Sequence, residues 1–368
     1  MGRCSGCGKE SRLISNALMA CAHCIRENYE KVKAPIEETH KRSRQEFSLP
    51  PLAPRDPSGQ ICHICFQECH IAEGKSGYCG LRINKEGKLM GGTSDQGNLF
   101  PYYDPLPTNC VADWVCPGGT GAGYPEFAYS TGPEYGYKNL AVFYNACSFN
   151  CLFCQNWQYR TRAYQEKRIS PDQLADFVDE DTACICYFGG DPTPQLPHSL
   201  LMSRLALKKK RNRILRICWE TNGCMDAGLL HEIVELSLES GGCVKFDLKA
   251  WNESIHLALC GASNKRTLEN FKSVAHFSKK RPNPSLFIAS TVLVPGYVDE
   301  EEVAGIAGFI ASLNHEIPYA LLGFYPHFYM KDLPTTSRTH AEKCKEVAEK
   351  EGLINVRIGN IHLLRNSY

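Results

Sequence analysis

From residue 139 to residue 360 the chain alternates between short apolar runs and longer amphipathic stretches. The apolar runs have the length of buried strands, and many are bounded by Gly, Pro or Asn. The expected strands are 139–146, 183–190, 214–222, 243–249, 286–296, 319–326 and 354–360. The expected helices are 170–181, 229–240, 265–280, 299–314 and 335–352. This alternation predicts parallel βα units, in which functional residues gather at the carboxyl ends of the strands.

The first 138 residues differ from this pattern in their amino-acid composition. Residues 1–34 hold two CxxC pairs and few apolar residues, which predicts a small unit nucleated by a metal. Residues 35–58 are charged and then rich in proline, which favours a linker. Residues 59–138 are rich in Cys, Gly and Pro and are expected to form an accessory segment of loops and short hairpins. The sequence therefore divides into these three parts and a fourth, residues 139–368.

Composition narrows the classes of function. The chain has 41 Lys and Arg against 40 Asp and Glu, so net charge does not indicate a nucleic-acid partner. No run approaches the roughly 20 apolar residues that span a bilayer, and the N-terminus lacks an apolar signal core. We therefore expect a cytoplasmic protein. Its 20 cysteines then favour metal binding over disulfides, although a disulfide-bonded secreted protein is an alternative.

The strongest chemical signal is a loop with three cysteines. Cys147, Cys151 and Cys154 directly follow the first expected strand, and three thiolates on so short a loop can hold one iron–sulfur cluster. A [4Fe–4S] cluster would keep one iron open for a ligand that is not protein. A structural zinc site normally has a fourth protein ligand. A zinc loop completed by a distant residue, or cysteines packed in a core, are the alternatives.

This CxxxCxxC loop after the first strand resembles the signature of radical S-adenosylmethionine (SAM) enzymes, and the resemblance extends over residues 139–360. Gly189–Pro192 resemble the GGEP motif of these enzymes, with Asp191 in place of Glu. Residues 220–223 and 246–249 resemble the pyruvate formate-lyase activating enzyme branch, and the tail is similar to its AmmeMemoRadiSam-like subgroup. The implied fold is α/β, a partial (β/α)6-type radical SAM barrel with Cys-rich N-terminal accessory regions.

The resemblance also implies a site. Cys147, Cys151 and Cys154 would bind the catalytic [4Fe–4S] cluster. The residues that would bind SAM are Gly189, Gly190, Asp191, Pro192, Thr221, Asn222, Asp247, Lys249 and His327. Lys249 is expected to pair with the carboxylate of SAM, and Asp247 and Thr221 with its hydroxyl groups. A salt bridge of Asp247 inside the barrel is the alternative.

The implied chemistry is reductive cleavage of SAM to methionine and a 5′-deoxyadenosyl radical, which abstracts hydrogen from a substrate. A reductase or ferredoxin would supply the electron. The substrate, which could be a protein or an RNA, is not indicated. Activation of a glycyl-radical enzyme is a second hypothesis. A third, from another class, is a zinc-stabilised protein- or RNA-binding protein with an inactive barrel.

Other cysteines fall into further groups. Cys62, Cys65, Cys69 and Cys79 make a full ligand set for zinc or a second Fe–S cluster, in which His63 or His70 could replace a cysteine. Cys4, Cys7, Cys21 and Cys24 have zinc-ribbon spacing, for a structural clip or a docking unit. Residues 104–116, with Cys110 and Cys116, would either shape the substrate pocket or pack as a loop. Cys184, Cys186, Cys218 and Cys243 are expected in the core.

Overall fold

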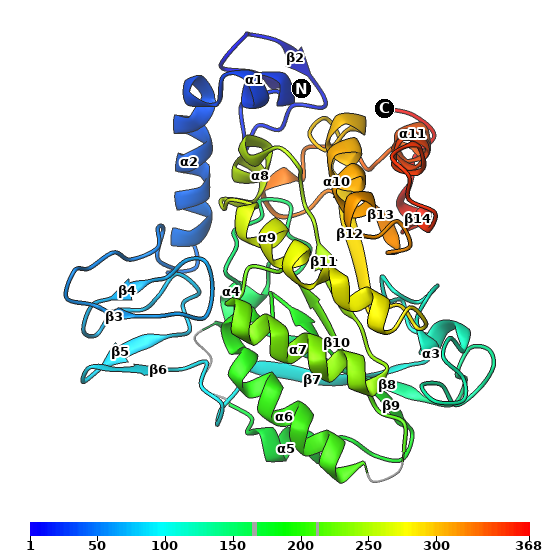
Figure 1. The fold of residues 1–368 in the computed structure, drawn as a ribbon. Coiled ribbons are helices and arrows are strands. Elements are labelled where there is room, and N and C mark those ends of the chain that lie inside the picture. Colours follow the sequence, from blue (N-terminus) through cyan, green and yellow to red (C-terminus); the bar gives the residue numbers. More distant parts are fainter. Residues whose placement is uncertain (164–167, 211–212) are drawn as a thin grey trace.

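The main body of the molecule is an eight-stranded sheet. The computed structural model describes residues 1–163, 168–210 and 213–368 (Figure 1). The strands, in sheet order, are β14 (Val356–Gly359), β13 (Tyr319–Gly323), β12 (Phe287–Leu293), β11 (Val244–Asp247), β10 (Arg216–Thr221), β9 (Thr182–Gly189), β8 (Lys138–Tyr144) and β7 (Leu99–Pro105). Strands β8 to β14 are parallel, and all seven coincide with expected strands. The α/β prediction is therefore confirmed.

Helices connect the parallel strands, and α6, α7, α9 and α10 lie along one side of the sheet (Figure 1). The helices of this part are α4 (Tyr159–Arg162), α5 (Pro171–Ala175), α6 (Leu196–Lys209), α7 (Ala227–Ser240), α8 (Glu253–Cys260), α9 (Lys265–Val274), α10 (Glu300–Leu313) and α11 (Arg338–Lys350). Short 3₁₀ turns are η1 (Thr193–Gln195), η2 (Ala275–Lys280), η3 (Phe328–Met330) and η4 (Ile361–Leu363). The sequence missed α8, and α5 ends six residues before the expected position.

The N-terminal part contains β1 (Gly2–Arg3), β2 (Glu10–Ser11), α1 (Ala22–Glu27) and the long helix α2 (Tyr29–Gln45). The linker expected over 35–58 is therefore wrong for residues 35–45. Pro35 removes one helical hydrogen bond, but the buried residues Val32, Ile36, His40 and Ser43 recur at helical spacing along one face. Burial of that stripe holds the helix together despite its charged sequence.

This N-terminal part packs directly on the barrel. Ile25 and Val32 belong to the same buried apolar cluster as Leu259 and Val294. Arg26 forms ion pairs with Asp299 and Glu302 at the start of α10, at 2.6 and 3.1 Å. The few apolar residues of the first 34 therefore contribute to a shared core.

The accessory segment forms short hairpins, as expected. The hairpins β3 (Gln60–Ile61) with β4 (His70–Ile71) and β5 (Ile83–Lys85) with β6 (Lys88–Met90) make a lobe beside one end of α2 (Figure 1). Two further elements were not expected here: the short helix α3 (Pro117–Thr120), and the seven-residue strand β7, which extends the main sheet by pairing antiparallel with β8.

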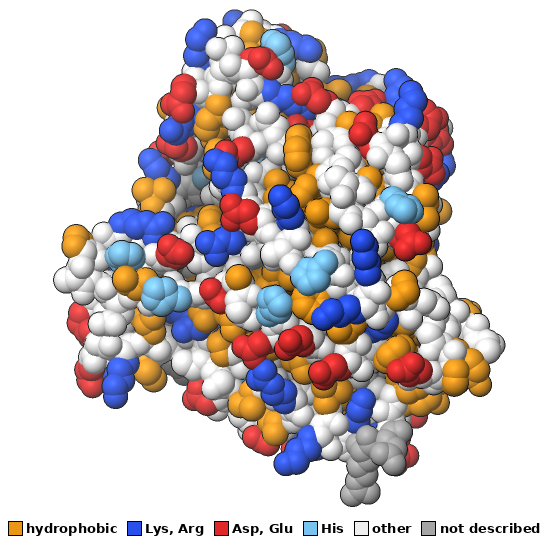
Figure 2. Space-filling view, in the orientation of Figure 1, with side chains coloured by type: hydrophobic (Ala, Val, Ile, Leu, Met, Phe, Trp, Pro, Cys, Tyr) orange, Lys and Arg blue, Asp and Glu red, His pale blue; other side chains and the backbone are white. Residues whose placement is uncertain are grey.

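The surface agrees with the balanced composition. Basic and acidic side chains are interspersed over the face that Figure 2 shows. Within the described parts of the chain, every helix is too short or too polar to cross a membrane.

Candidate active site

The three-cysteine loop follows β8 and rests on the end of α8. The amide of Asn150 donates to the carbonyl of Cys260, and the amide of Leu152 donates to that of Leu259, both at 2.9 Å. Cys147 and Cys151 are each 9% exposed. A hydrogen bond from Cys260 lowers the pKa of the Cys151 thiol to about 7, against the opposing effect of burial. All three cysteines line one pocket at the carboxyl end of the sheet.

Helix α2 supports this loop through one side chain. The Asn150 amide nitrogen Nδ2 lies 3.0 Å from each of three acceptors, His40 Nδ1, His40 O and Ser43 Oγ, which share its two N–H groups. Since Nδ1 of His40 accepts, its Nε2 carries the proton, which it donates to Ala258 O at 2.9 Å. Burial lowers the pKa of His40 to about 4, so the ring stays neutral. Helix α2, which the sequence did not predict, therefore helps to hold the three-cysteine loop in place.

We expect Asn150→Ala to lower the free energy of unfolding by about 2–4 kcal/mol, because it strips buried acceptors of their donor. The same variant should bind less iron after reconstitution. Denaturant titration and iron analysis measure the two effects. Asn355→Ala, which loses one exposed bond to Glu316 O, is the matched control and should change stability by less than about 1 kcal/mol. Equal effects of the two changes would contradict the assigned role.

Most of the expected SAM-binding residues converge on the three-cysteine pocket. Those that line it are Gly189, Gly190, Asp191, Thr221, Asn222, Asp247 and Lys249. They come from the carboxyl ends of β9, β10 and β11, as strand-end chemistry predicts. Two are not among its lining residues. Pro192 precedes the η1 turn. His327 packs beside Trp157 and Tyr325, next to the three-cysteine loop.

Asp191 braces two strand ends. Its carboxylate accepts from the amides of Thr193 and Asn222, both at 2.7 Å, and from Thr221 Oγ1 at 3.2 Å. Asn222 in turn donates through Nδ2 to Ser148 Oγ at 3.1 Å, within the cysteine loop. Because both Asp191 oxygens bond to protein donors, this carboxylate fixes the relative positions of β9, β10 and the loop.

The two glycines before Asp191 are required by the backbone. Gly189 has φ +115°, a region that residues with a Cβ rarely adopt. A Cβ on Gly190 would lie 2.3 Å from the carbonyl oxygen of Ala146. The motif can therefore run close against the cysteine loop, and the Gly190 and Asp191 amides donate to Tyr144 O and Ala146 O.

Two cations face the cysteines. Burial would lower the pKa of Lys249, but Asp247 and Cys151 raise it well above its usual value; Lys249 Nζ lies 2.9 Å from Asp247 Oδ2. Arg160 is 1% exposed, and none of its three guanidinium nitrogens has a hydrogen-bond acceptor among the residues described. Its guanidinium packs against the rings of Tyr159 and Phe328. A buried guanidinium without an acceptor, next to three thiols, fits a bound anionic group.

A second cavity lies deeper inside the barrel, and it is lined in part by residues of the 104–116 segment, which was expected either to shape the substrate pocket or to pack as a loop. Six cysteines line it, which we call the thiol cavity: Cys110, Cys116, Cys184, Cys186, Cys218 and Cys243. Lys245 Nζ lies there, 3.2 Å from Cys110 Sγ, 3.1 Å from Cys186 Sγ and 3.0 Å from Glu220 Oε1. Glu220 lines both this cavity and the three-cysteine pocket. The strand cysteines expected in the core therefore face a cavity that adjoins the site.

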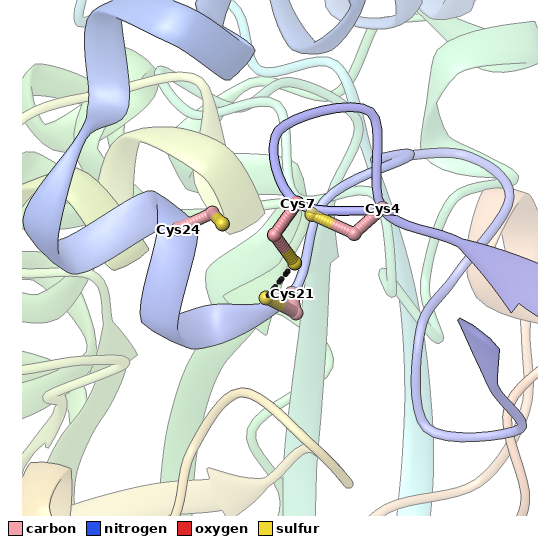
Figure 3. A group of neighbouring side chains, drawn as sticks. All are labelled: Cys4, Cys7, Cys21 and Cys24. Carbon is pink, nitrogen blue, oxygen red and sulfur yellow. Dashed lines mark hydrogen bonds between the residues drawn. The ribbon is translucent and has the colours of Figure 1, made fainter. Parts of the chain in front are cut away.

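The N-terminal cysteines form a compact group (Figure 3). Cys4 and Cys7 lie on the loop between β1 and β2, Cys21 immediately precedes α1, and Cys24 lies within it. Their four sulfur atoms all lie within 4.8 Å of one another, and Cys7 and Cys21 are 3.9 Å apart. In the described parts of the chain no other group of three or more Cys, His, Asp or Glu ligands is this tight.

Fold and site together define an α/β protein with a three-cysteine pocket at the carboxyl edge of a parallel sheet. Residues 141–307 match the family model of the radical SAM superfamily. The chain therefore carries a radical SAM domain.

Three similar proteins illustrate its relationships. An uncharacterized protein of Methanocaldococcus jannaschii is 26% identical over 83% of this chain and 84% of its own length. The isethionate sulfite-lyase activating enzyme of Desulfovibrio desulfuricans is 34% identical, and the match covers 46% of this chain but only 55% of that enzyme. A solved domain of a pyruvate-formate lyase-activating enzyme from Bacteroides vulgatus is 21% identical, with TM-score 0.37, over 48% of this chain and 98% of that domain.

Proposed function

We propose that the chain is an active radical SAM enzyme whose [4Fe–4S] cluster is held by Cys147, Cys151 and Cys154. The observation that carries the proposal is that these cysteines line one pocket with seven of the nine residues expected to bind SAM. When bound, the cluster and SAM would supply one electron and a 5′-deoxyadenosyl radical that removes hydrogen from a substrate. The electron would come from a reductase or ferredoxin.

The residues of the pocket would divide the work of positioning. Lys249 is a cation suited to the SAM carboxylate. Thr221 and Asp247 offer oxygen atoms suited to hydroxyl groups. The glycines at 189 and 190 leave backbone exposed to the SAM amino group. Arg160 would balance the negative charge of the cluster and its thiolates from the buried side.

The direct test is the EPR spectrum of anaerobically reconstituted, dithionite-reduced protein with and without SAM. We expect a [4Fe–4S]⁺ signal that changes on adding SAM, and loss of that SAM-sensitive signal in the Cys147→Ala/Cys151→Ala/Cys154→Ala variant. Formation of 5′-deoxyadenosine would confirm cleavage. A fully reconstituted protein with neither property would instead favour the zinc-stabilised protein- or RNA-binding protein with an inactive barrel.

Glycyl-radical activation is the second candidate, because a similar protein of Methanocaldococcus jannaschii, 26% identical over 55% of this chain, is named as a putative glycyl-radical enzyme activating enzyme. In that case the substrate is a protein, and the expected product is a glycyl-radical EPR signal in the partner enzyme. Absence of this signal with every glycyl-radical enzyme of the host would leave another substrate, such as a small molecule or an RNA.

For the N-terminal cysteines we propose one structural zinc ion. With Zn–S bonds of about 2.3 Å, tetrahedral thiolates lie about 3.8 Å apart, close to the 3.9 Å between Cys7 and Cys21. We expect Cys21→Ser to lose one zinc per chain and at least about 3 kcal/mol of stability. Metal analysis and denaturant titration measure both. Cys344→Ala, at a buried cysteine of α11, should keep the zinc; unchanged zinc in Cys21→Ser would refute the site.

A further inference from the structure

The four cysteines of the hairpin lobe surround one small cavity. Cys62, Cys65, Cys69 and Cys79 all line it, and Cys62 and Cys69 are only 8% and 6% exposed. Neither His63 nor His70 is among its lining residues. The ligand set offered to this cavity is therefore four thiols, which is a closed set with no open position for a small-molecule ligand.

The spacing of these sulfurs distinguishes between a single ion and a cluster. Two thiolates bound to the same zinc can be at most about 4.6 Å apart, twice the Zn–S bond length. The N-terminal group falls near this limit, whereas the lobe group does not form a set within 4.8 Å. The sulfurs of Cys147, Cys151 and Cys154, which the structure also describes, do not form a set within 4.8 Å either. Sulfurs that surround a cavity at wider spacing fit a polynuclear cluster, whose irons separate the thiolates.

Charge supports the same conclusion. Arg82 lines the lobe cavity and is 7% exposed. Its Nη2 donates to Gly92 O, but its Nε has no acceptor among the described residues. This repeats the arrangement of Arg160 at the three-cysteine site: a buried guanidinium with an unpartnered N–H beside cysteines that would need a counter-charge as metal-bound thiolates.

The cavity lined by the four lobe cysteines is in contact with the three-cysteine loop. Ser148, the residue after Cys147, lines it. Gln67 Nε2 donates to Ser148 O at 3.1 Å, and Cys224 Sγ lies 2.9 Å from Ser148 Oγ. The amide of Phe66 donates to Cys224 O at 3.0 Å. The two cysteine sites are therefore adjacent, because Ser148 lines the lobe cavity and directly follows Cys147 in the chain.

We propose that Cys62, Cys65, Cys69 and Cys79 hold a second [4Fe–4S] cluster, which relays electrons to the cluster at Cys147, Cys151 and Cys154. The relay role rests on the function proposed above. One electron leaves the reduced lobe cluster, which returns to its oxidised state, and enters the SAM-binding cluster. The external reductase or ferredoxin then replaces it. A closed thiolate set suits this role, because it exchanges electrons without binding substrate.

Metal content tests the cluster itself. The reconstituted protein is expected to contain about eight irons and eight sulfides per chain. The Cys147→Ala/Cys151→Ala/Cys154→Ala variant should keep about four of each and an EPR signal that SAM does not change. The Cys62→Ser/Cys69→Ser/Cys79→Ser variant should lose the other half and keep the SAM-sensitive signal. Two zinc ions per chain and no iron in the first variant would overturn the proposal, with Cys344→Ala as the cysteine control.

The relay is tested by changing the reductant. We expect Cys62→Ser/Cys69→Ser/Cys79→Ser to cleave SAM at least tenfold more slowly than the wild type with a reduced ferredoxin. With dithionite, which can reach the SAM-binding cluster directly, the difference should be less than threefold. If the variant cleaved SAM as fast as the wild type with both reductants, the relay would be refuted but the second cluster would not. Loss of cleavage by the wild type with dithionite would instead refute the proposed function.

Discussion

Arg216→Met is expected to destabilise the protein by about 3–5 kcal/mol, one of the largest effects of any single substitution in the chain. Arg216 and Glu134 are 2% and 0% exposed, and Nη1 of Arg216 lies 2.9 Å from Glu134 Oε1. Removing the guanidinium leaves a buried carboxylate without its counter-charge. It also frees the loop around α3 from β10, since Arg216 donates to Phe127 O as well. Denaturant unfolding under reducing conditions measures the loss.

Two controls separate the buried charge from other effects. The double variant Arg216→Met/Glu134→Leu removes both charges and should recover much of the lost stability. Arg204→Met removes an ion pair with Glu232 whose side chains are 54% and 40% exposed, and should cost less than about 1 kcal/mol. If Arg216→Met lowered the stability no more than Arg204→Met, the buried pair of Arg216 and Glu134 would contribute no more than an ion pair on the surface.

Lys249→Met is expected to weaken SAM binding about 10- to 150-fold, the equivalent of a charge-assisted hydrogen bond worth about 1.5–3 kcal/mol. Cluster content should stay unchanged, because Lys249 is not a thiolate ligand. Titration of the SAM-induced EPR change gives the affinity, and iron analysis gives the cluster content.

Lys265→Met is the matched control, since that side chain is 70% exposed and pairs with Glu253 on the surface. Its affinity for SAM should equal that of the wild type. If Lys249→Met also left the affinity unchanged, Lys249 would serve only its salt bridge with Asp247, which is the alternative that the sequence left open.

The parallel strands were predictable because each is a compact apolar run with a sharp boundary. The seven residues that line the three-cysteine pocket came instead from the resemblance to radical SAM enzymes. Helix α2 was not predictable in the same way. Its sequence combines Pro35 with many charges, and its stability depends on a buried stripe whose partner surface, on α8, is distant in sequence. Tertiary contacts override local preference there.

The part that the strand cysteines play in the thiol cavity escaped prediction for a different reason. Cysteine is a small apolar residue in the interior of most proteins, so Cys184 or Cys218 within an apolar strand reads as packing. Only the fold brings the inward-facing cysteines of β9 and β10, and Cys243 just before β11, together with Cys110 and the ammonium group of Lys245. No local pattern contains that convergence.

Helix α2 links the three cysteine sites mechanically. Its first turn follows closely after Cys24, His40 and Ser43 hold Asn150 in the cluster loop, and Arg44 bonds to the carbonyl of Tyr78, next to Cys79. The chain therefore cannot be cut into independent modules at the barrel boundary. A fragment beginning at residue 139 would retain Cys147, Cys151 and Cys154, yet leave the side chain of Asn150 without the acceptors that position its loop. Transplanting the barrel alone into another protein would carry the same defect.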